Sequence, residues 1–235
     1  MRKRTYLIGA SLGIIGALLA GTVASAAVTG QTYSATATPK KQDKKRRGPV
    51  AFTNVVDTTY SGGFSPVASQ TVLTFSRDFV FTPGNLPQCP LGNVNNKPEA
   101  TAKANCPGSI IGQGSAKING GALSAVVTAF NGQPEGGRPV ILLHTSVNND
   151  ALDPVLKGVL DTSSNTLTVQ IPNTGTAITH FDTTINKIKT GKKSFFVMAR
   201  CKKKKWVNSE TTTFLGGTST SATSVQKCKQ KPAKK

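Results

Sequence analysis

Residues 194–228 decide the fold and read SFFVMARCKKKKWVNSETTTFLGGTSTSATSVQKC. The continuous apolar run over 194–200 is typical of a short buried strand. Side chains alternate in character over 206–214, and the β-branched threonines there suit a pleated surface. Gly216-Gly217 interrupts this pattern, and a third strand is expected over 218–225. The stretch therefore predicts three short antiparallel strands joined by turns.

Four lysines, Lys202–Lys205, separate the first two of these strands. They are expected in an exposed connection, because burying four like charges side by side would be prohibitive. In the strand that follows, Trp206, Asn208 and Glu210 share one face. Trp206 could stack on a sugar or a base, but we expect it to pack against the core or a disulfide.

The chain has four cysteines: Cys89, Cys106, Cys201 and Cys228. An even number in an exported chain implies disulfides, and four cysteines allow three pairings. We expect Cys89 to pair with Cys106 and Cys201 with Cys228, because each pair brackets a local excursion of the chain. A zinc site is not favoured, since there is no CxxC spacing and no histidine near either pair.

The first 26 residues have the pattern of a secretory signal peptide. Arg2, Lys3 and Arg4 precede an apolar stretch over 6–20, and Ala24-Ser25-Ala26 is a small-x-small cleavage site. The alternative is an uncleaved N-terminal anchor. No later stretch approaches the ~20 apolar residues of a membrane helix. We therefore expect a secreted or extracellular protein, associated with the cell wall, that does not span the membrane after cleavage.

The rest of the chain divides by composition into three parts. Residues 27–49 are rich in Thr, Ala, Ser and Lys and end in KKQDKKRRGP, so they are predicted to be a disordered basic linker. Residues 50–228 form the expected β domain, and residues 229–235 form a basic tail. The linker could be a solvated spacer or an electrostatic attachment, and the two roles are compatible.

Turn signals recur through residues 50–228 at intervals of roughly 8 to 12 residues. We expect strands over 50–59 and 71–81, a hairpin about Asn119-Gly120, and a second turn at Asn131-Gly132. Only the segment 100–104 suggests a helical turn. The pattern of about ten short strands predicts an all-β fold, a single antiparallel sandwich or jelly-roll-like domain with two disulfides.

Several motifs are shared with a set of secreted proteins. Residues 106–116 fit CP-x-S-x-I-G-x-G-x-A, an aromatic-Asn-Gly turn follows at 130–132, and Cys201, Trp206 and Cys228 form a closing Cys…Trp…Cys segment. In these features the chain resembles uncharacterised secreted β-sandwich-like proteins of high-GC Gram-positive bacteria, over roughly residues 50–228. The resemblance implies an exported β domain and no particular activity. The lysine run and the basic ends depart from the pattern.

Candidate catalytic residues are few. The two histidines, His144 and His180, could each be combined on paper with Asp182 and a serine, but no Gly-x-Ser-x-Gly elbow is present. The ten carboxylates are scattered rather than paired. The loop Asn148–Asp153 offers oxygen ligands for calcium without the EF-hand spacing. We expect no catalytic activity, no metal and no cofactor.

Positive charge is the feature that distinguishes the sequence. The formal net charge is +19, and basic residues concentrate in 40–47, 187–193, 200–205 and 227–235. Such charge can serve solubility alone or attract a polyanion. Sequence-specific nucleic-acid recognition is not expected, because aromatic residues are few and no recognition motif is present. The predicted polyanion-binding residues are Lys44, Lys45, Arg46, Arg47, Lys192, Lys193, Lys202, Lys203, Lys204 and Lys205.

These observations favour a secreted, non-enzymatic β protein that associates with the cell envelope through basic segments. The expected partner is an anionic envelope polymer or polysaccharide. The alternative is a secreted carbohydrate-binding domain or a hydrolase whose site is built from loops. A cleft with two close carboxylates, or a histidine–carboxylate pair, would favour that alternative.

Overall fold

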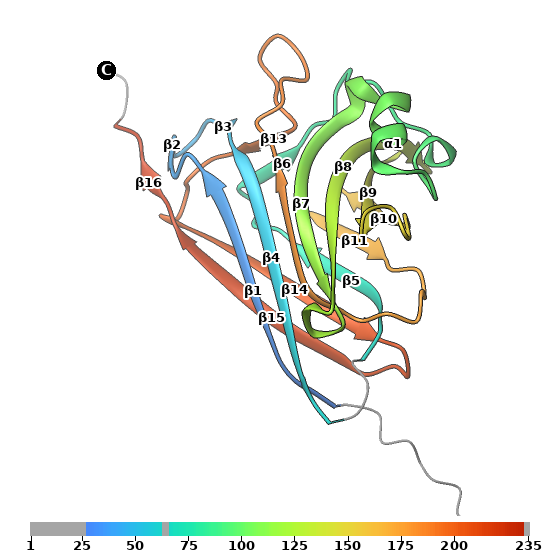
Figure 1. Ribbon diagram of the computed structural model, residues 1–235. Helices are drawn as coiled ribbons and strands as arrows, with labels where there is room; N and C mark the ends of the chain where they lie inside the picture. The colour runs from blue at the N-terminus through green and yellow to red at the C-terminus, as the bar shows by residue number, and fades with distance from the viewer. Residues whose placement is uncertain (1–26, 63–65, 233–235) are drawn as a thin grey trace, which may run out of the picture.

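The computed structural model describes residues 27–62 and 66–232, and its main feature is one antiparallel sheet that curls on itself (Figure 1). The predicted signal peptide, residues 1–26, lies outside the described residues. The strands of the sheet follow the order β1 (Ala27–Thr38), β4 (Ala51–Ser61), β12 (Ile178–Ile185), β7 (Ile110–Ile118), β8 (Leu123–Glu135), β9 (Arg138–Val147), β10 (Val155–Asp161), β11 (Thr166–Gln170), β5 (Ala68–Thr74), β14 (Lys205–Phe214) and β15 (Ser219–Lys227).

The two outermost strands, β1 and β15, lie beside each other and nearly close the sheet into a cylinder (Figure 1). At this seam, side chains of β15 form hydrogen bonds with the backbone of β1. The Ala35 N–H donates to Ser224 Oγ at 2.8 Å, and the Ala37 N–H donates to Gln226 Oε1 at 2.7 Å. Gln226 Nε2 in turn donates to the Ala37 carbonyl at 3.3 Å. These contacts satisfy backbone groups that an open sheet edge would leave exposed.

Two small sheets and the helical segments lie toward one end of the cylinder, apart from a 3₁₀ turn at the β7–β8 hairpin (Figure 1). The order β3 (Gly48–Pro49), β13 (Val197–Ala199), β6 (Phe79–Phe81) makes a three-stranded sheet, and β2 (Lys41–Gln42) pairs in parallel with β16 (Lys229–Gln230). The helical segments are α1 (Glu99–Asn105) and the 3₁₀ turns Leu91–Asn93, Pro107–Ser109 and Asn119–Gly121.

The core lies inside the cylinder and is aromatic at one end. The ring of Phe52 packs edge-on against Phe75 and Phe79, with centroids 5.4 and 4.9 Å away, and Trp206 packs on Phe79 at 5.2 Å. A second, smaller core fills the space between α1 and the outer face of β8 and β9. Because β9 is covered on both faces, its sequence is a continuous apolar run rather than an alternating one.

The predicted all-β antiparallel fold is confirmed, and so are the two disulfides, Cys89–Cys106 and Cys201–Cys228. The two facing layers expected of a sandwich are opposite walls of one curled sheet. The helical turn expected near 100–104 is α1, and the hairpin about Asn119-Gly120 joins β7 to β8. With all four cysteines bonded in pairs, none is available to bind zinc.

The prediction of a disordered linker over 27–49 is wrong. Residues 27–38 form β1, and 41–42 and 48–49 form β2 and β3. In β1, Tyr33, Ala35 and Ala37 are buried while the residues between them face outward. Two of these three buried side chains are alanines, so β1 shows little hydrophobic signal in the sequence.

Two local predictions are also corrected. Asn131-Gly132 is not a turn but part of β8. Asn131 is buried, and its amide donates to the carbonyls of Leu86 and Pro87 at 3.3 and 3.0 Å. A Cβ at Gly132 would lie 2.8 Å from the Val140 side chain, so the glycine serves close packing. The single strand expected over 71–81 is divided into β5 and β6, and only Val197–Ala199 of the 194–200 run forms a strand.

Candidate polyanion-binding site

Three basic segments that are far apart in the sequence meet at one end of the cylinder. The parallel pairing of β2 with β16 places Lys41 opposite Lys229. The Cys201 N–H donates to the Asp43 carbonyl at 2.8 Å, and the Cys228 N–H donates to the Lys204 carbonyl at 2.9 Å. Backbone hydrogen bonds therefore hold the segments 40–47, 200–205 and 227–231 together.

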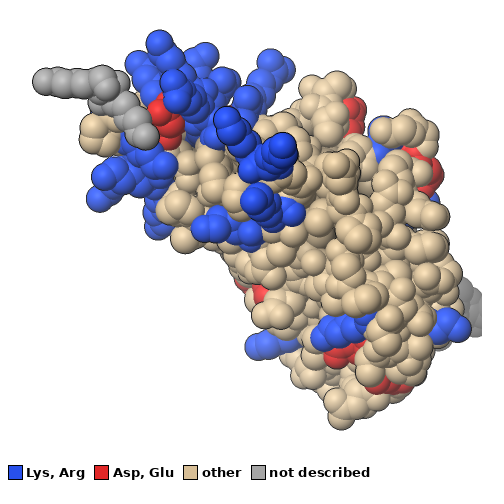
Figure 2. Space-filling view, turned by 90° about the horizontal axis from the view of Figure 1, so that it is seen from above, with Lys and Arg blue, Asp and Glu red and all other residues tan. Residues whose placement is uncertain are grey.

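We call the assembly of 40–47, 77–78, 200–205 and 227–231 the basic end. It contains fifteen lysine and arginine side chains and two carboxylates, and Figure 2 shows the cationic side chains gathered on one part of the surface. All of the cationic residues are exposed except Arg200, which is half-buried. They are Lys40, Lys41, Lys44, Lys45, Arg46, Arg47, Arg77, Arg200, Lys202, Lys203, Lys204, Lys205, Lys227, Lys229 and Lys231.

The two carboxylates of the basic end are both used internally. Asp78 is buried and accepts hydrogen bonds from Arg200 Nε at 2.9 Å and from the Lys202 N–H at 3.0 Å. Asp43 accepts from the N–H groups of Lys45 and Arg46 at 2.7 and 2.9 Å. These backbone hydrogen bonds, with that of Arg46 first, lower the pKa of Asp43. The charges of Arg46 and Lys231 lower the pKa of Asp43 further, so two carboxylates are set against fifteen cations in the basic end.

Arg47 is held at the basic end by backbone carbonyl groups and lies near a second cation, Arg200. The Arg47 guanidinium donates to the carbonyl oxygens of Asp78 and Arg77 at 3.3 and 3.1 Å. Partial burial lowers the pKa of Arg47, and the positive charge of Arg200 lowers it further. A bound anion would relieve the repulsion between the two cations.

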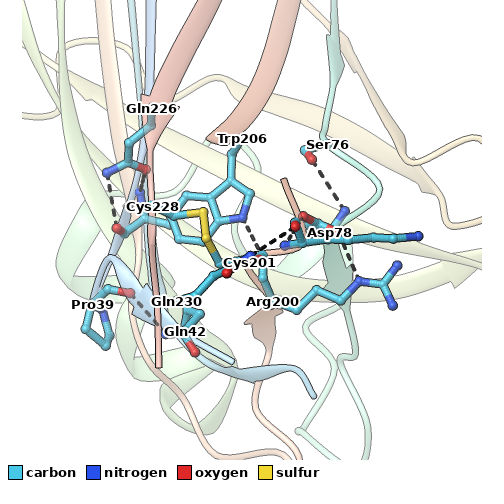
Figure 3. The surroundings of a disulfide bond; sticks show 12 residues. Pro39, Gln42, Ser76, Asp78, Arg200, Cys201, Trp206, Gln226, Cys228 and Gln230 are labelled. Atoms are coloured by element: carbon cyan, nitrogen blue, oxygen red, sulfur yellow. Dashed lines mark hydrogen bonds and ion pairs between the residues drawn. A yellow bond between two sulfur atoms is a disulfide. The ribbon is translucent and has the colours of Figure 1, made fainter. Parts of the chain in front are cut away.

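The turn that carries Lys202–Lys205 is fixed to the core by the Cys201–Cys228 disulfide and by Trp206 (Figure 3). Trp206 is fully buried, and its indole Nε1 donates to the Arg200 carbonyl at 2.6 Å. Gln230 Nε2 donates to the carbonyls of Cys201 and Lys202 at 3.0 and 3.1 Å. The expectation that Trp206 packs in the core is confirmed, so its ring is not exposed for stacking on a ligand.

The structure brings together most of the predicted polyanion-binding residues. Lys44–Arg47 and Lys202–Lys205 belong to the basic end. Lys192 and Lys193 lie in the loop between β12 and β13, which Figure 1 shows at the same end of the molecule. The Asn85 N–H, in the segment that follows β6, donates a hydrogen bond of 3.4 Å to the Thr190 carbonyl in that loop. Residues 229–231, expected only as tail, complete the site through β16.

Of the two histidines, His144 is fully buried and its Nε2 lies 2.7 Å from the Lys97 carbonyl. His180 lies on the outer face between two carboxylates. Its Nδ1 is 2.6 Å from Asp57 and its Nε2 is 3.3 Å from Asp182. The hydroxyl of Ser115 donates to Asp182. Sequence reasoning paired His180 with Asp182 but missed Asp57, which is distant in the chain.

This cluster is the histidine–carboxylate pair that the hydrolase alternative requires, but its connectivity differs from a serine triad. In a triad the serine hydroxyl bonds to the histidine that removes its proton. Here both ring nitrogens face carboxylates, and Ser115 is bonded to Asp182 instead. Asp182 also lines a groove of about 500 Å³ beside α1, together with Glu99, Lys103 and Thr184.

In the Asn148–Asp153 loop, Asp150 makes internal hydrogen bonds, whereas Oδ1 of Asp153 is buried without a partner. Asp150 Oδ1 accepts from Ser146 Oγ at 2.6 Å and from the Glu99 N–H at 2.9 Å. Those hydrogen bonds lower the pKa of Asp150, whereas burial raises the pKa of Asp153. Within residues 27–62 and 66–232, no three His, Cys, Asp or Glu side chains cluster as metal ligands would.

Comparison with known proteins finds no matching family model, no matching curated protein and no matching solved structure. Across the described part of the chain, no helix is both long enough and apolar enough to cross a membrane.

Proposed function

We propose that this protein is a secreted, non-enzymatic β protein that the basic end holds on anionic polymers of the cell envelope. The convergence of 40–47, 200–205 and 227–231 on one surface is the observation that carries the proposal. Fifteen cations with two internally bonded carboxylates form a concentrated positive surface. A surface of one sign attracts a polymer of the other sign.

The expected ligand is a flexible chain of repeated phosphate, sulfate or carboxylate groups. Exposed lysines bind such groups as point charges and release condensed counterions, which makes binding tolerant of sequence and sensitive to salt. A shaped pocket is not needed for this mode of binding. The two disulfides agree with an oxidising compartment, and the signal-like residues 1–26 support export.

The remaining surface has the opposite character. Outside the basic end and the 187–193 loop, the described residues hold five cations and eight acids. Positive charge is therefore concentrated at one end of the protein, and we expect a polyanion to approach from the basic end only. This orientation leaves the opposite end of the cylinder free of the polymer.

The proposal is tested by comparing two variants that each lose four positive charges, one in the basic end and one elsewhere on the surface. One variant replaces Lys202–Lys205 by glutamine. The matched control replaces Lys97, Lys117, Arg138 and Lys157 by glutamine, which also removes four positive charges. In sedimentation with isolated envelope material at about 50 mM salt, the first variant should bind at least about tenfold more weakly, and the control should bind like wild type. Equal losses in both variants would show a net-charge effect and refute the site.

The groove beside α1 supports a second candidate function, carbohydrate binding or hydrolysis. It combines the carboxylates of Glu99 and Asp182 with the hydroxyl of Thr184, and polar groups of this kind bind sugar hydroxyls. Asp182→Asn would abolish binding or hydrolysis of an envelope glycan at this groove while leaving salt-sensitive binding unchanged. If Asp182→Asn leaves glycan binding and turnover unchanged, this second function is rejected.

A further inference from the structure

The interior of the curled sheet is not completely filled by side chains. A cavity of about 100 Å³ lies between β4, β12, β10, β11 and β5. Phe75 and Phe81 belong to both its wall and the aromatic core. A curled sheet of many strands encloses more space than a small one, because the diameter grows with strand number. The aromatic cluster therefore occupies only part of the enclosed space.

The wall of the cavity is apolar over most of its area. Leu143, Leu156, Leu160, Leu167 and Val169 line it from one side, and Phe181 and Ile185 line it from β12. Most of the polar groups in the wall are already paired. Thr71 and Thr212 share a hydrogen bond of 2.8 Å, and Asn54 accepts from Tyr33 at 2.7 Å.

Thr183 is the exception among the buried polar residues of the wall. Its side chain is 95% buried, it lines the cavity, and its hydroxyl oxygen has no hydrogen-bond partner. A buried hydroxyl without a partner is unfavourable, so a polar group supplied by a ligand would be favoured at this position. One unpaired hydroxyl is too few to hold an ordered water, which needs two to four polar partners.

We propose that the cavity is a binding site for a small, largely apolar molecule with one hydrogen-bonding group, such as a phenol. The apolar wall would enclose the ring, and the hydroxyl of Thr183 would pair with the polar group. At about 100 Å³ the cavity is smaller than an engineered apolar cavity of about 150 Å³ that accommodates benzene, so we expect no ligand larger than a single ring. A long acyl chain does not fit. This site is separate from the basic end and does not depend on the function proposed for it.

Phenol and benzene are the probes that test the site. Both would be titrated into the chain lacking the predicted signal peptide, and binding would be followed by NMR shifts of the cavity methyl groups. Wild type should bind both probes. Thr183→Val keeps the side-chain shape and removes the hydroxyl, so it should weaken phenol about fivefold to tenfold and leave benzene unchanged. An equal effect on both probes would overturn the role of Thr183.

Filling the cavity gives the second arm of the test. Leu156→Phe should abolish binding of both probes, and Val169→Leu should weaken both if Leu156→Phe fails to fold. Failure of wild type to bind either probe would overturn the proposal. Undiminished benzene binding in a folded filling variant would also overturn it, because the probe would then occupy another place.

Discussion

The indole of Trp206 donates a 2.6 Å hydrogen bond to the carbonyl oxygen of Arg200, six residues earlier in the chain. Four lysines of the basic end, Lys202–Lys205, lie in the chain between these two residues. Trp206 is fully buried beside Phe79, so this bond fixes an exposed cationic turn directly to the aromatic core. The position of the lysines is thus set by the interior of the protein.

Replacing Trp206 by phenylalanine should lower the free energy of unfolding by about 2–4 kcal/mol. The change leaves the Arg200 carbonyl without its partner and opens space beside Phe79. Urea denaturation followed by circular dichroism measures the loss. Val207→Ala is the control, since Val207 is 43% exposed and its truncation should change stability by no more than about 0.5 kcal/mol. Similar losses in both variants would contradict the anchoring role of Trp206.

The two disulfides should differ in their effect on binding. They close loops of similar length, with sequence separations of 17 and 27 residues, so each should contribute about 3–4 kcal/mol in the chain-entropy model. Only Cys201–Cys228 joins two segments of the basic end. We expect the Cys201→Ser/Cys228→Ser variant to bind polyphosphate more weakly, and Cys89→Ser/Cys106→Ser to bind like wild type at a temperature where both are folded. The reverse order of affinities would contradict the account.

The seam between β1 and β15 depends on side chains rather than on a backbone ladder. Removing Gln226 as Gln226→Leu leaves the backbone groups of Ala37 without partners and should cost about 1–3 kcal/mol. Ser224→Ala should have a similar effect through Ala35. Ser221→Ala, on the exposed face of the same strand, should be nearly neutral. Hydrogen exchange at the Ala35 and Ala37 amides would show whether the seam opens in Gln226→Leu and Ser224→Ala. Protection equal to that of wild type would argue against closure of the sheet by these side chains.

Glu210 makes stability depend on pH. Its side chain is fully buried on β14, and burial raises its pKa above the ordinary value of 4.5. The folded state therefore holds the proton more tightly than the unfolded chain. This contribution to stability is complete below the unfolded pKa and is lost as pH rises through the folded pKa.

The variant Glu210→Gln isolates this contribution. The difference in unfolding free energy between variant and wild type should grow in favour of the variant as pH rises from about 4 toward neutrality, and then level off. Urea denaturation across that range measures it. The pKa of Tyr33, raised first by burial and then by the charge of Glu210, should fall in the same variant. A pH-independent difference would mean that Glu210 ionises as it does in water.

The sequence predicts local structure more reliably than long-range contacts. The alternation of 206–214 correctly places Trp206, Asn208 and Glu210 on one face, and both disulfides follow from the local segments that they bracket. The same alternation hides the fact that Asn208 and Glu210 are buried, because polar residues in a strand usually face water. Their burial depends on β5 and β1, which are distant in the chain.

The missed features all join distant segments. Apart from Tyr33, the buried residues of β1 are alanines, so its composition resembles that of a linker. Its strand character comes from pairing with β4. Lys41 and Lys229 are brought together by one short parallel pair, and His180 meets Asp57 through the pairing of β12 with β4. Hydrophobic periodicity carries no information about such pairings. The charge of the binding surface could be predicted from the sequence, whereas its assembly could not.

The most direct test of the basic end is a salt titration of binding to linear polyphosphate, with uncharged dextran as the control polymer. We predict tight binding at about 50 mM salt and a linear fall of log K with log salt, and replacing Lys202–Lys205 by glutamine should make the slope shallower by roughly 0.7–0.9 for each ionic contact removed. The control variant lacking Lys97, Lys117, Arg138 and Lys157 should keep the wild-type slope. Absence of binding at low salt, or affinity that does not change with salt, would contradict electrostatic retention through the basic end.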